Sequence, residues 1–121
     1  MKIEDLEIYN LSMDLSDKIW NLVCQWEYFA KDTVGKQWVR AADSIDANIS
    51  EGFGRFTSKD SKNFYIIARG SMQESKTWLT KAFRRKLITE NEYRELLKEW
   101  TTVNFKMINF LKAHSKLMEN K

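Results

Sequence analysis

The sequence has no proline and only one cysteine, one histidine and four glycines among its 121 residues. A chain of average composition and this length would carry about six prolines. Because proline breaks helices and is common in turns, its absence disfavours a β-sandwich and favours long helices. A single cysteine, Cys24, excludes an intrachain disulfide and is typical of a reducing compartment. One histidine and one cysteine cannot complete a Cys/His zinc site within one chain, so we expect no metal.

Long hydrophobic runs are also missing. The longest solid apolar run, residues 64–68, covers five residues, whereas a membrane-spanning helix needs roughly 20. The first ten residues carry Glu4, Asp5 and Glu7 where a secretion signal has cations followed by an apolar stretch. The sequence therefore predicts a soluble cytoplasmic protein with no membrane partner.

Apolar residues recur at spacings of three and four along most of the chain, which is the pattern of helices that bury one face. The repeats predict four helices at roughly 6–30, 33–53, 59–86 and 90–118, in one domain spanning 1–121. Only short connections separate them, so consecutive helices should be antiparallel neighbours. We therefore expect an all-α fold, an antiparallel up-down-up-down four-helix bundle.

Local signals set the expected helix ends. Asp32-Thr33 is the predicted start of the second helix, and Gly52 and Gly54 are predicted to end it. Thr57 should cap the third helix, because a short side-chain oxygen satisfies free backbone N–H groups. Residues 89–92, Thr-Glu-Asn-Glu, form the pattern of a capping box at the start of the fourth helix.

Several polar side chains fall on or beside the apolar faces of the two central helices. If the turn between these helices centres near residue 57, Arg40 lies level with Glu74, and we predict an ion pair between them. The predicted polar network comprises Arg40, Asn48, Glu51, Arg69 and Glu74. Such a network most often fixes helix register. The alternative is that Arg40 or Arg69 stays partly exposed and is available to a phosphate or a partner carboxylate.

The central hairpin is the cationic part of the chain, because residues 32–86 hold 11 of the 20 lysines and arginines. Cations gather near the turn and again near residues 81–86, and Lys62, Arg69 and Lys76 recur every seven residues along one stripe. This pattern is compatible with an ordinary solvated surface, but such a track could also follow a nucleic-acid backbone. The candidate phosphate contacts are Arg40, Arg55, Lys59, Lys62, Arg69, Lys76, Arg84 and Arg85.

Enzymatic constellations are nearly absent, so we predict that the protein is not an enzyme. His114 lies on an apolar helix face with no serine or aspartate partner at a suggestive spacing. Cys24 lies among apolar neighbours, and we expect an inert, buried thiol. Residues 52–55, Gly-Phe-Gly-Arg, lack the ending of a phosphate loop and a preceding strand, so they are interpreted as a helix terminator.

The chain has more aromatic residues than one small core requires. Trp20, Tyr28, Trp38 and Phe56 lie off the main apolar stripes or near helix ends, where aromatics often mark a subunit interface. We therefore expect a homo-oligomer. The leading hypothesis is a non-catalytic bundle that binds RNA or DNA through the central cations, and the alternative is a protein–protein adaptor or scaffold.

The segments around residues 40–55 and 64–74 resemble the 23S rRNA intervening-sequence protein family, which consists of small bacterial proteins. The resemblance rests on Arg40-Ala41-Ala42, Ser44-Ile45, Asn48-Ile49, Glu51-Gly52-Phe53-Gly54-Arg55, Phe64, Ala68-Arg69-Gly70-Ser71 and Glu74. It implies a four-helix bundle that assembles as a ring-shaped homopentamer, with no enzymatic activity and no cofactor. It also implies a relationship to the accessory protein of diversity-generating retroelements. Thr33-Val34 and Asp46-Ala47 stand where family members often carry proline, which implies a straighter second helix here.

Overall fold

The computed structural model describes residues 1–119, and these residues form helices and short connections with no strand among them. A short 3₁₀ helix, η1 (Ile3–Asp5), precedes α1 (Glu7–Val23). A continuous helical stretch then comprises α2 (Tyr28–Ala30), the π-helical turn η2 (Lys31–Gly35) and α3 (Lys36–Phe53). Two longer helices follow, α4 (Ser58–Arg84) and α5 (Glu90–Glu119). The predicted all-α fold class is confirmed.

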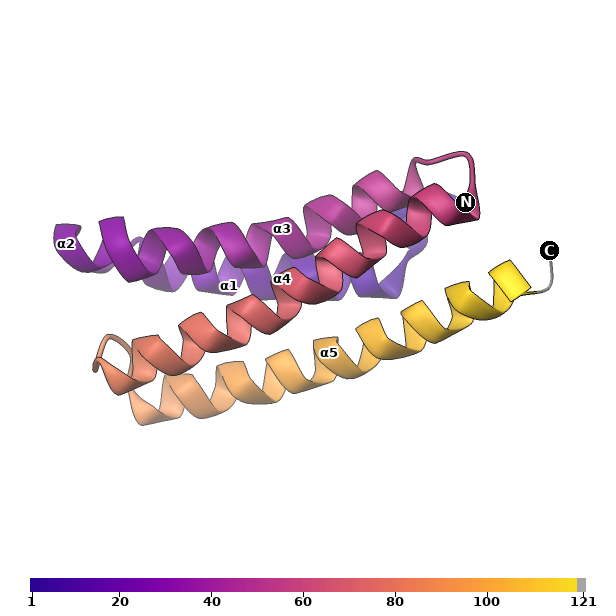
Figure 1. The fold of residues 1–121 in the computed structure, drawn as a ribbon. Helices are drawn as coiled ribbons and strands as arrows, with labels where there is room; N and C mark the ends of the chain where they lie inside the picture. Colours follow the sequence, from indigo (N-terminus) through magenta and orange to yellow (C-terminus); the bar gives the residue numbers. More distant parts are fainter. Residues whose placement is uncertain (120–121) are drawn as a thin grey trace.

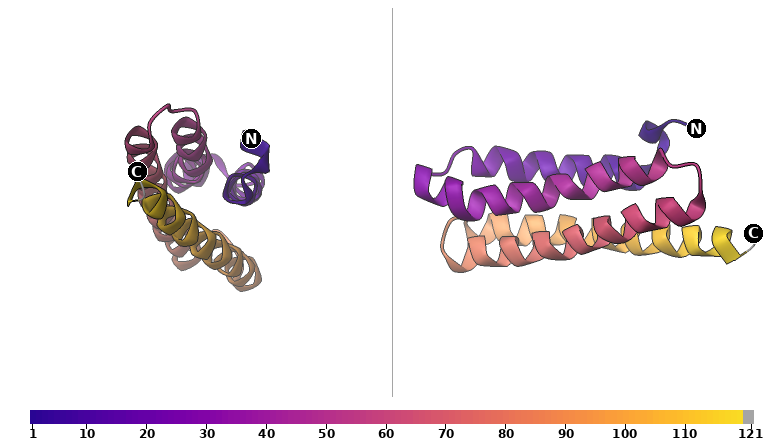
Figure 2. Two further views of the ribbon diagram at one scale, coloured as in Figure 1. Left: turned by 90° about the vertical axis from the view of Figure 1, so that its right-hand side faces the viewer. Right: turned by 45° about the horizontal axis from the view of Figure 1, so that its top comes forward.

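The long helices lie side by side as a four-helix bundle (Figure 1). Helix α1 packs against α3 and α5, and α4 packs against the same two helices. The N-terminus and the end of α5 lie at one end of the bundle, and successive connections lie at alternating ends (Figures 1 and 2). Consecutive long helices therefore run in opposite directions, as predicted. The last two residues of the predicted domain, 120 and 121, lie outside the described part of the chain.

The two strongest predicted helix starts are present. Thr57 caps α4, because its Oγ1 accepts a hydrogen bond of 3.1 Å from the backbone N–H of Asp60. The capping box of α5 is complete: the Thr89 N–H donates to Glu92 Oε1 at 2.8 Å, and the Glu92 N–H donates to Thr89 Oγ1 at 3.1 Å. At both helix starts, these side chains accept hydrogen bonds from backbone N–H groups that have no partner within the helix.

The boundary between the first two long helices is not where the sequence predicted it. Helix α1 ends at Val23 rather than near residue 30, and the second helical stretch starts at Tyr28 rather than at residue 33. Thr33 does not cap a helix; its Oγ1 donates to the backbone oxygen of Phe29, 2.7 Å away and one turn earlier. A threonine that bonds back in this way lies inside a helix rather than at its start. The connection is therefore the four residues 24–27.

Two glycines allow the helices to approach closely. A Cβ added to Gly35 would lie 2.6 Å from Val23 Cγ1, so this glycine lets the chain fold back onto the end of α1. A Cβ added to Gly52 would lie 2.4 Å from the Tyr65 ring and 3.0 Å from the Ser61 oxygen. Gly52 was predicted only as a helix breaker, but it lies inside α3 and makes room for α4.

The core runs along the centre of the bundle, and its largest fully buried side chains are Trp38, Leu15, Ile19, Ile45, Ile49, Met72, Met107 and Val103. Trp38 has no exposed surface, so the prediction that it belongs to an exposed interface is wrong. Because Trp38, Ile45 and Ile49 are spaced by seven and four residues, they share the inner face of α3. The Trp38 ring lies near that of Trp26, with 6.0 Å between the centroids.

Candidate nucleic-acid interface

Helix α4 ends in a conformation that is unusual for its residue type. Lys86 has a φ of 60°, in the left-handed region that glycine most often occupies at this position. The Lys86 N–H donates to the Phe83 oxygen at 3.0 Å, and the Leu87 N–H donates to the Ala82 oxygen at 2.9 Å. This pair of bonds is a Schellman motif, which satisfies the last carbonyl groups of the helix. The motif ends α4 next to a run of cations.

Three of these cations form one concave site, which we call the cationic end. Lys81, Arg84 and Arg85 line a cavity of about 310 Å³ at the end of α4. Arg84 and Arg85 are exposed. Among residues 1–119, neither arginine takes part in an ion pair. Lys81 lies over the Trp78 ring, with Nζ 5.0 Å from the ring centroid. The predicted candidates Arg84 and Arg85 are therefore brought together, and Lys81 joins them.

Two residues of the predicted stripe, Arg69 and Lys76, lie beside the neighbouring helix α5, and Lys62 is exposed. Lys76 Nζ lies 4.8 Å from the centroid of the Trp100 ring. The Trp100 ring is itself fixed, because its Nε1 donates to the Met72 oxygen at 2.9 Å and to Ser75 Oγ at 3.1 Å. A cation over the face of a held indole ring is attracted to it and has a restricted position.

Arg69 opens onto a groove of about 560 Å³, which we call the α4–α5 groove. It is lined by Arg69, Ile108, Leu111, Lys112, Ser115, Lys116 and Glu119. Sequence reasoning missed Lys112 and Lys116, which lie four residues apart on α5 and therefore on one face of it. Their spacing was the available signal, but only the packing of α5 against α4 places them opposite Arg69.

The turn between α3 and α4 is less cationic than predicted. Arg55 pairs with Glu51, with 3.0 Å between guanidinium and carboxylate, and its guanidinium lies 4.4 Å from the centroid of the Phe64 ring. Glu51 and Asp60 both line the cavity of about 620 Å³ beside this turn. Lys59 and Lys62 are exposed, but the neighbouring carboxylates weaken the local positive potential. Arg55 is thus engaged within the chain.

The predicted Arg40–Glu74 ion pair is not formed. The four ion pairs within residues 1–119 are Lys18–Glu99, Arg55–Glu51, Arg94–Glu90 and Lys106–Glu7. Arg40 and Glu74 are both exposed, so burial does not force them to pair. The Glu74 carboxylate instead accepts from Trp78 Nε1 at 3.2 Å, within α4.

A smaller polar network takes the place of that pair. Ser44 Oγ on α3 and Ser71 Oγ on α4 are 2.8 Å apart. Asn48 Nδ2 donates to Ser44 Oγ at 2.9 Å and to the Ser44 backbone oxygen at 2.8 Å. If Arg40 lay level with Glu74, Ser44 would lie level with Gly70, so the observed Ser44–Ser71 contact is one residue further along α4. Of the predicted network, Asn48 thus bonds within α3, and Arg69 lies in the α4–α5 groove.

The opposite flank of the bundle, between α1 and α3, is acidic. Asp46 is buried, and its Oδ2 accepts a hydrogen bond of 2.8 Å from Ser16 Oγ on α1. Burial, aided by the charges of Asp43 and Asp17, raises the pKa of Asp46 to about 6, although the Ser16 hydrogen bond opposes the shift. Burial and the charge of Asp17 also raise the pKa of Asp43. Phosphates would be repelled from this flank.

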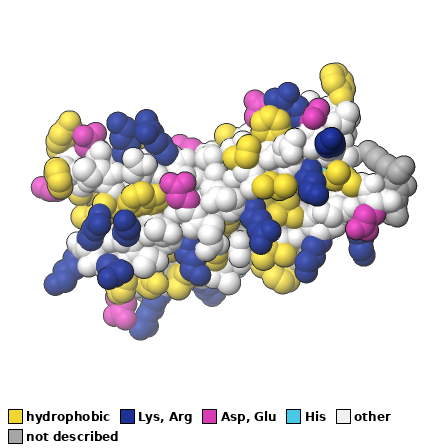
Figure 3. All heavy atoms as spheres, in the orientation of Figure 1, with side chains coloured by type: hydrophobic (Ala, Val, Ile, Leu, Met, Phe, Trp, Pro, Cys, Tyr) yellow, Lys and Arg dark blue, Asp and Glu magenta, His cyan; other side chains and the backbone are white. Residues whose placement is uncertain are grey.

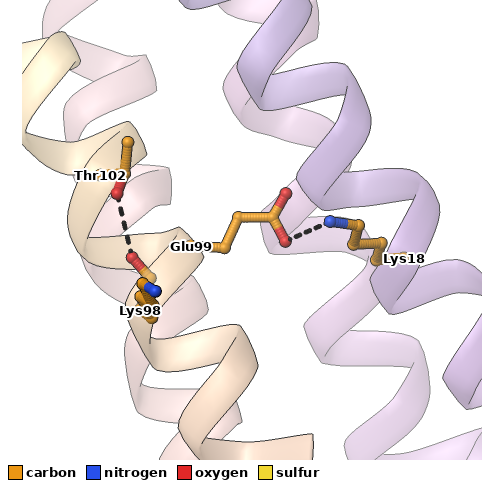
Figure 4. A network of polar contacts seen from close by, with 4 residues as sticks. All are labelled: Lys18, Lys98, Glu99 and Thr102. Carbon is orange, nitrogen blue, oxygen red and sulfur yellow. Dashed lines mark hydrogen bonds and ion pairs between the residues drawn. The ribbon is translucent and has the colours of Figure 1, made fainter.

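A second groove, of about 640 Å³, lies between α1 and α5. Lys18 Nζ spans it to Glu99 Oε2 at 2.9 Å, while Thr102 bonds to the Lys98 backbone one turn away on α5 (Figure 4). Glu92 and Glu95 also line this groove. Because carboxylates outnumber cations there, this face is a poor site for a polyanion.

The single cysteine and histidine occupy unremarkable positions. Cys24 was expected to be buried, but it is exposed in the connection after α1, since that helix ends one residue earlier. His114 is half-buried; its Nε2 lies 2.8 Å from the Ser58 oxygen, and its ring packs edge-on against Tyr65. Within residues 1–119, no three His, Cys, Asp or Glu side chains cluster as metal ligands. No described helix is both long and apolar enough to span a membrane.

Comparisons with known proteins agree with this architecture. A family model described as 23S rRNA-intervening sequence protein matches residues 4–109. A crystal structure of a protein of unknown function, from the S23 ribosomal protein family of Bacteroides thetaiotaomicron VPI-5482, is similar with a TM-score of 0.78 and 27% identity. The similarity covers 87% of this chain and 98% of that one. A search of curated proteins finds no match. Neither matching description names a catalytic activity.

Proposed function

The chain belongs to the 23S rRNA-intervening sequence protein family, and we propose that it is a non-catalytic, oligomeric bundle that binds RNA or DNA. The observation that carries the proposal is the cationic end, where Lys81, Arg84 and Arg85 line one concavity. Guanidinium groups without a carboxylate partner are suited to bind phosphate oxygens. The acidic α1–α3 flank supports an orientation in which the nucleic acid contacts another side of the bundle.

A salt titration of RNA binding tests this proposal. Fluorescence anisotropy with a labelled single-stranded RNA gives the dissociation constant at several salt concentrations. Each lost phosphate contact should reduce the log–log salt slope by about 0.7 on single strands, or by about 0.9 on a B-DNA duplex. Arg84→Ala and Arg85→Ala should therefore weaken binding and flatten the slope.

The matched control is Arg94→Ala. Arg94 is an exposed arginine near the start of α5, but its guanidinium is paired with Glu90 at 2.8 Å. This variant should leave the affinity and the slope nearly unchanged. If Arg84→Ala and Arg85→Ala behave like Arg94→Ala, the cationic end is not the binding surface.

The proposal includes self-assembly through exposed apolar side chains. Trp20 is 54% exposed, Tyr28 79% and Phe56 fully exposed, so three of the four aromatics predicted to lie at an interface are accessible. Aromatic side chains are enriched at the interfaces between protein chains, so these exposed rings support the proposed self-assembly. Light scattering should give a mass several times that of the 14.4 kDa chain. A monomer at micromolar concentration would contradict this part of the proposal.

A protein–protein adaptor is the second candidate function. The observation that favours it is the pair Tyr28 and Phe29, adjacent on α2 and both more than 70% exposed. Aromatic side chains are enriched among the residues that dominate protein interfaces. An adaptor would retain its partner at high salt, whereas a phosphate contact would not. Binding that survives high salt and is lost in Tyr28→Ser would favour the adaptor.

A further inference from the structure

We propose that the α4–α5 groove binds single-stranded nucleic acid, its cationic rims holding the phosphates and its apolar floor contacting the bases. This inference rests on the proposed function and names its substrate class. It adds a second surface to the cationic end, formed partly by a helix that the sequence did not implicate.

Cations border the groove on both sides. Arg69 is on the α4 side, and Lys112 and Lys116 are on the α5 side. Of the described residues that line the groove, Glu119 alone carries a carboxylate. Lys62 and Lys76 extend the α4 rim, because they are seven residues before and after Arg69 and so share its face. The rim from Lys62 to Lys76 is about 21 Å long at 1.5 Å per residue.

The floor of the groove is apolar, which distinguishes single strands from duplexes. Ile108 and Leu111 line the groove together with the cations, and both are half-buried. A duplex presents phosphates and sugars to such a groove, and its bases stay stacked inside. The bases of a single strand are free to pack on apolar and aromatic side chains while its phosphates contact cations.

An exposed aromatic ring lies on the same face of α5. Phe105 is 62% exposed, and it precedes Lys112 by seven residues, which is two helical turns. Ile66, 51% exposed, precedes Arg69 by three residues on α4. Over α4 and α5, Lys and Arg side chains are interspersed with hydrophobic ones on the visible face (Figure 3). This interleaving of cations with apolar groups matches the surfaces that track single strands.

An acidic amphipathic helix fits the groove less well. A helix docked in a groove buries apolar side chains at positions such as i, i+4 and i+7, which requires a floor of about 10 Å. The apolar floor here consists of Ile108 and Leu111, three residues or about 4.5 Å apart along α5. With Phe105 included, the apolar side chains span about 9 Å of α5, still short of that length, whereas the line of cations on α4 spans about 21 Å, as a flexible polyanion requires.

The test compares a labelled 20-nucleotide poly-uridylate with an RNA duplex of the same length, using the full chain. We expect tighter binding of the single strand. Lys112→Gln should weaken that binding and lower the salt slope by about 0.7. Phe105→Leu, which keeps an apolar side chain but removes the ring, should weaken it about fivefold or more with no change in slope. Because Phe105 and Lys112 are both exposed, circular dichroism should show intact helices.

The control is Lys98→Gln, an exposed lysine on α5 that lines the α1–α5 groove instead. It should bind poly-uridylate like the unaltered protein. If the duplex binds as tightly as the single strand and Lys112→Gln has no effect, the groove assignment is wrong while the proposed function stands. If polyglutamate displaces the RNA equally well per charge, the groove responds to charge alone and the inference also fails. If neither nucleic acid binds, the proposed function fails with it.

Discussion

Asp46 is a buried carboxylate whose ionisation opposes folding. Its pKa rises from 3.8 to about 6 on folding, so the folded state binds the proton more tightly than the unfolded state. The free energy of unfolding should therefore fall as pH rises from 4 to above 6, by up to about 3 kcal/mol. Asp46→Asn should abolish this fall and make the protein more stable at pH 7.5. Urea unfolding at a series of pH values measures both effects.

The neighbours of Asp46 provide controls in opposite directions. Asp17→Asn removes a charge that raises the pKa of Asp46, so the fall in stability should occur at lower pH. Ser16→Ala removes the hydrogen bond that lowers this pKa, so the fall should move to higher pH. An Asp46→Asn variant with the same pH dependence as the unaltered protein would show that another group is responsible.

Lys86 is held in a backbone conformation that is unfavourable for a residue with a side chain. Lys86→Gly should raise the free energy of unfolding by about 1 kcal/mol, because glycine adopts this conformation without steric strain. It should also weaken RNA binding, since a positive charge next to Arg85 is lost. Lys86→Asn separates the two effects, because asparagine tolerates the left-handed region but has no charge. A less stable Lys86→Gly protein would contradict the argument.

At the scale of one residue, the sequence was a limited guide. The candidates Arg84 and Arg85 come together because they are adjacent in the chain. The Arg40–Glu74 pair is not formed, because both side chains are exposed and Glu74 accepts a hydrogen bond from Trp78 within α4 instead. The prediction that Cys24 is buried was wrong, because the exposure of this residue depends on where α1 ends.

Substitutions at Gly52 and Gly70 test how closely the two central helices, α3 and α4, pack. Gly52→Ala would place a methyl group 2.4 Å from the Tyr65 ring, so α3 and α4 would have to separate. We expect a loss of about 1–3 kcal/mol in the free energy of unfolding. Gly70→Ala is the matched control, since an added Cβ there meets nothing within 4 Å. That variant should gain up to about 1 kcal/mol from helix propensity.

Chemical unfolding of both variants decides between close packing and simple helix propensity. If Gly52→Ala were as stable as Gly70→Ala, the close approach of α3 and α4 would not matter. The third variant, Gly35→Ala, should resemble Gly52→Ala, because its methyl group would meet Val23 Cγ1 at 2.6 Å.

Helix ends were predictable where a capping group marks them. Thr57 and Thr89 bond their own helix starts, and such local bonds follow from sequence alone. The connection at residues 24–27 has no comparable signal: Glu27 precedes α2 without a side-chain capping bond. The apolar spacing also continued through Trp26 and Phe29, although Phe29 is 73% exposed. Periodicity therefore predicted one long helix where the chain turns back.

At the scale of the molecule, the bundle followed from helix length and short connections, which leave few other arrangements. The distribution of charge around the bundle did not. The chain is nearly balanced, with a net charge of +3. Packing nevertheless separates Asp43 and Asp46 on one flank from Arg69, Lys112 and Lys116 on the other. Which charged residues lie on the same side of the bundle depends on which of the helices α1, α3, α4 and α5 pack against each other.

The proposed assembly of several copies would repeat the cationic end in each copy, and this repetition predicts how RNA length should affect binding. A short RNA contacts one end, so Arg84→Ala should lower its salt slope by about 0.7. An RNA several times longer contacts the ends of two or more copies, so the same substitution removes one phosphate contact from each. For the longer RNA, Arg84→Ala should therefore lower the salt slope by a multiple of about 0.7. The substitution should also weaken binding of the longer RNA more than binding of the short one, because linked contacts reinforce one another. Anisotropy titrations of both RNAs with the unaltered protein and Arg84→Ala measure these slopes. Equal changes at both lengths would mean that each RNA meets one cationic end, whatever mass light scattering reports.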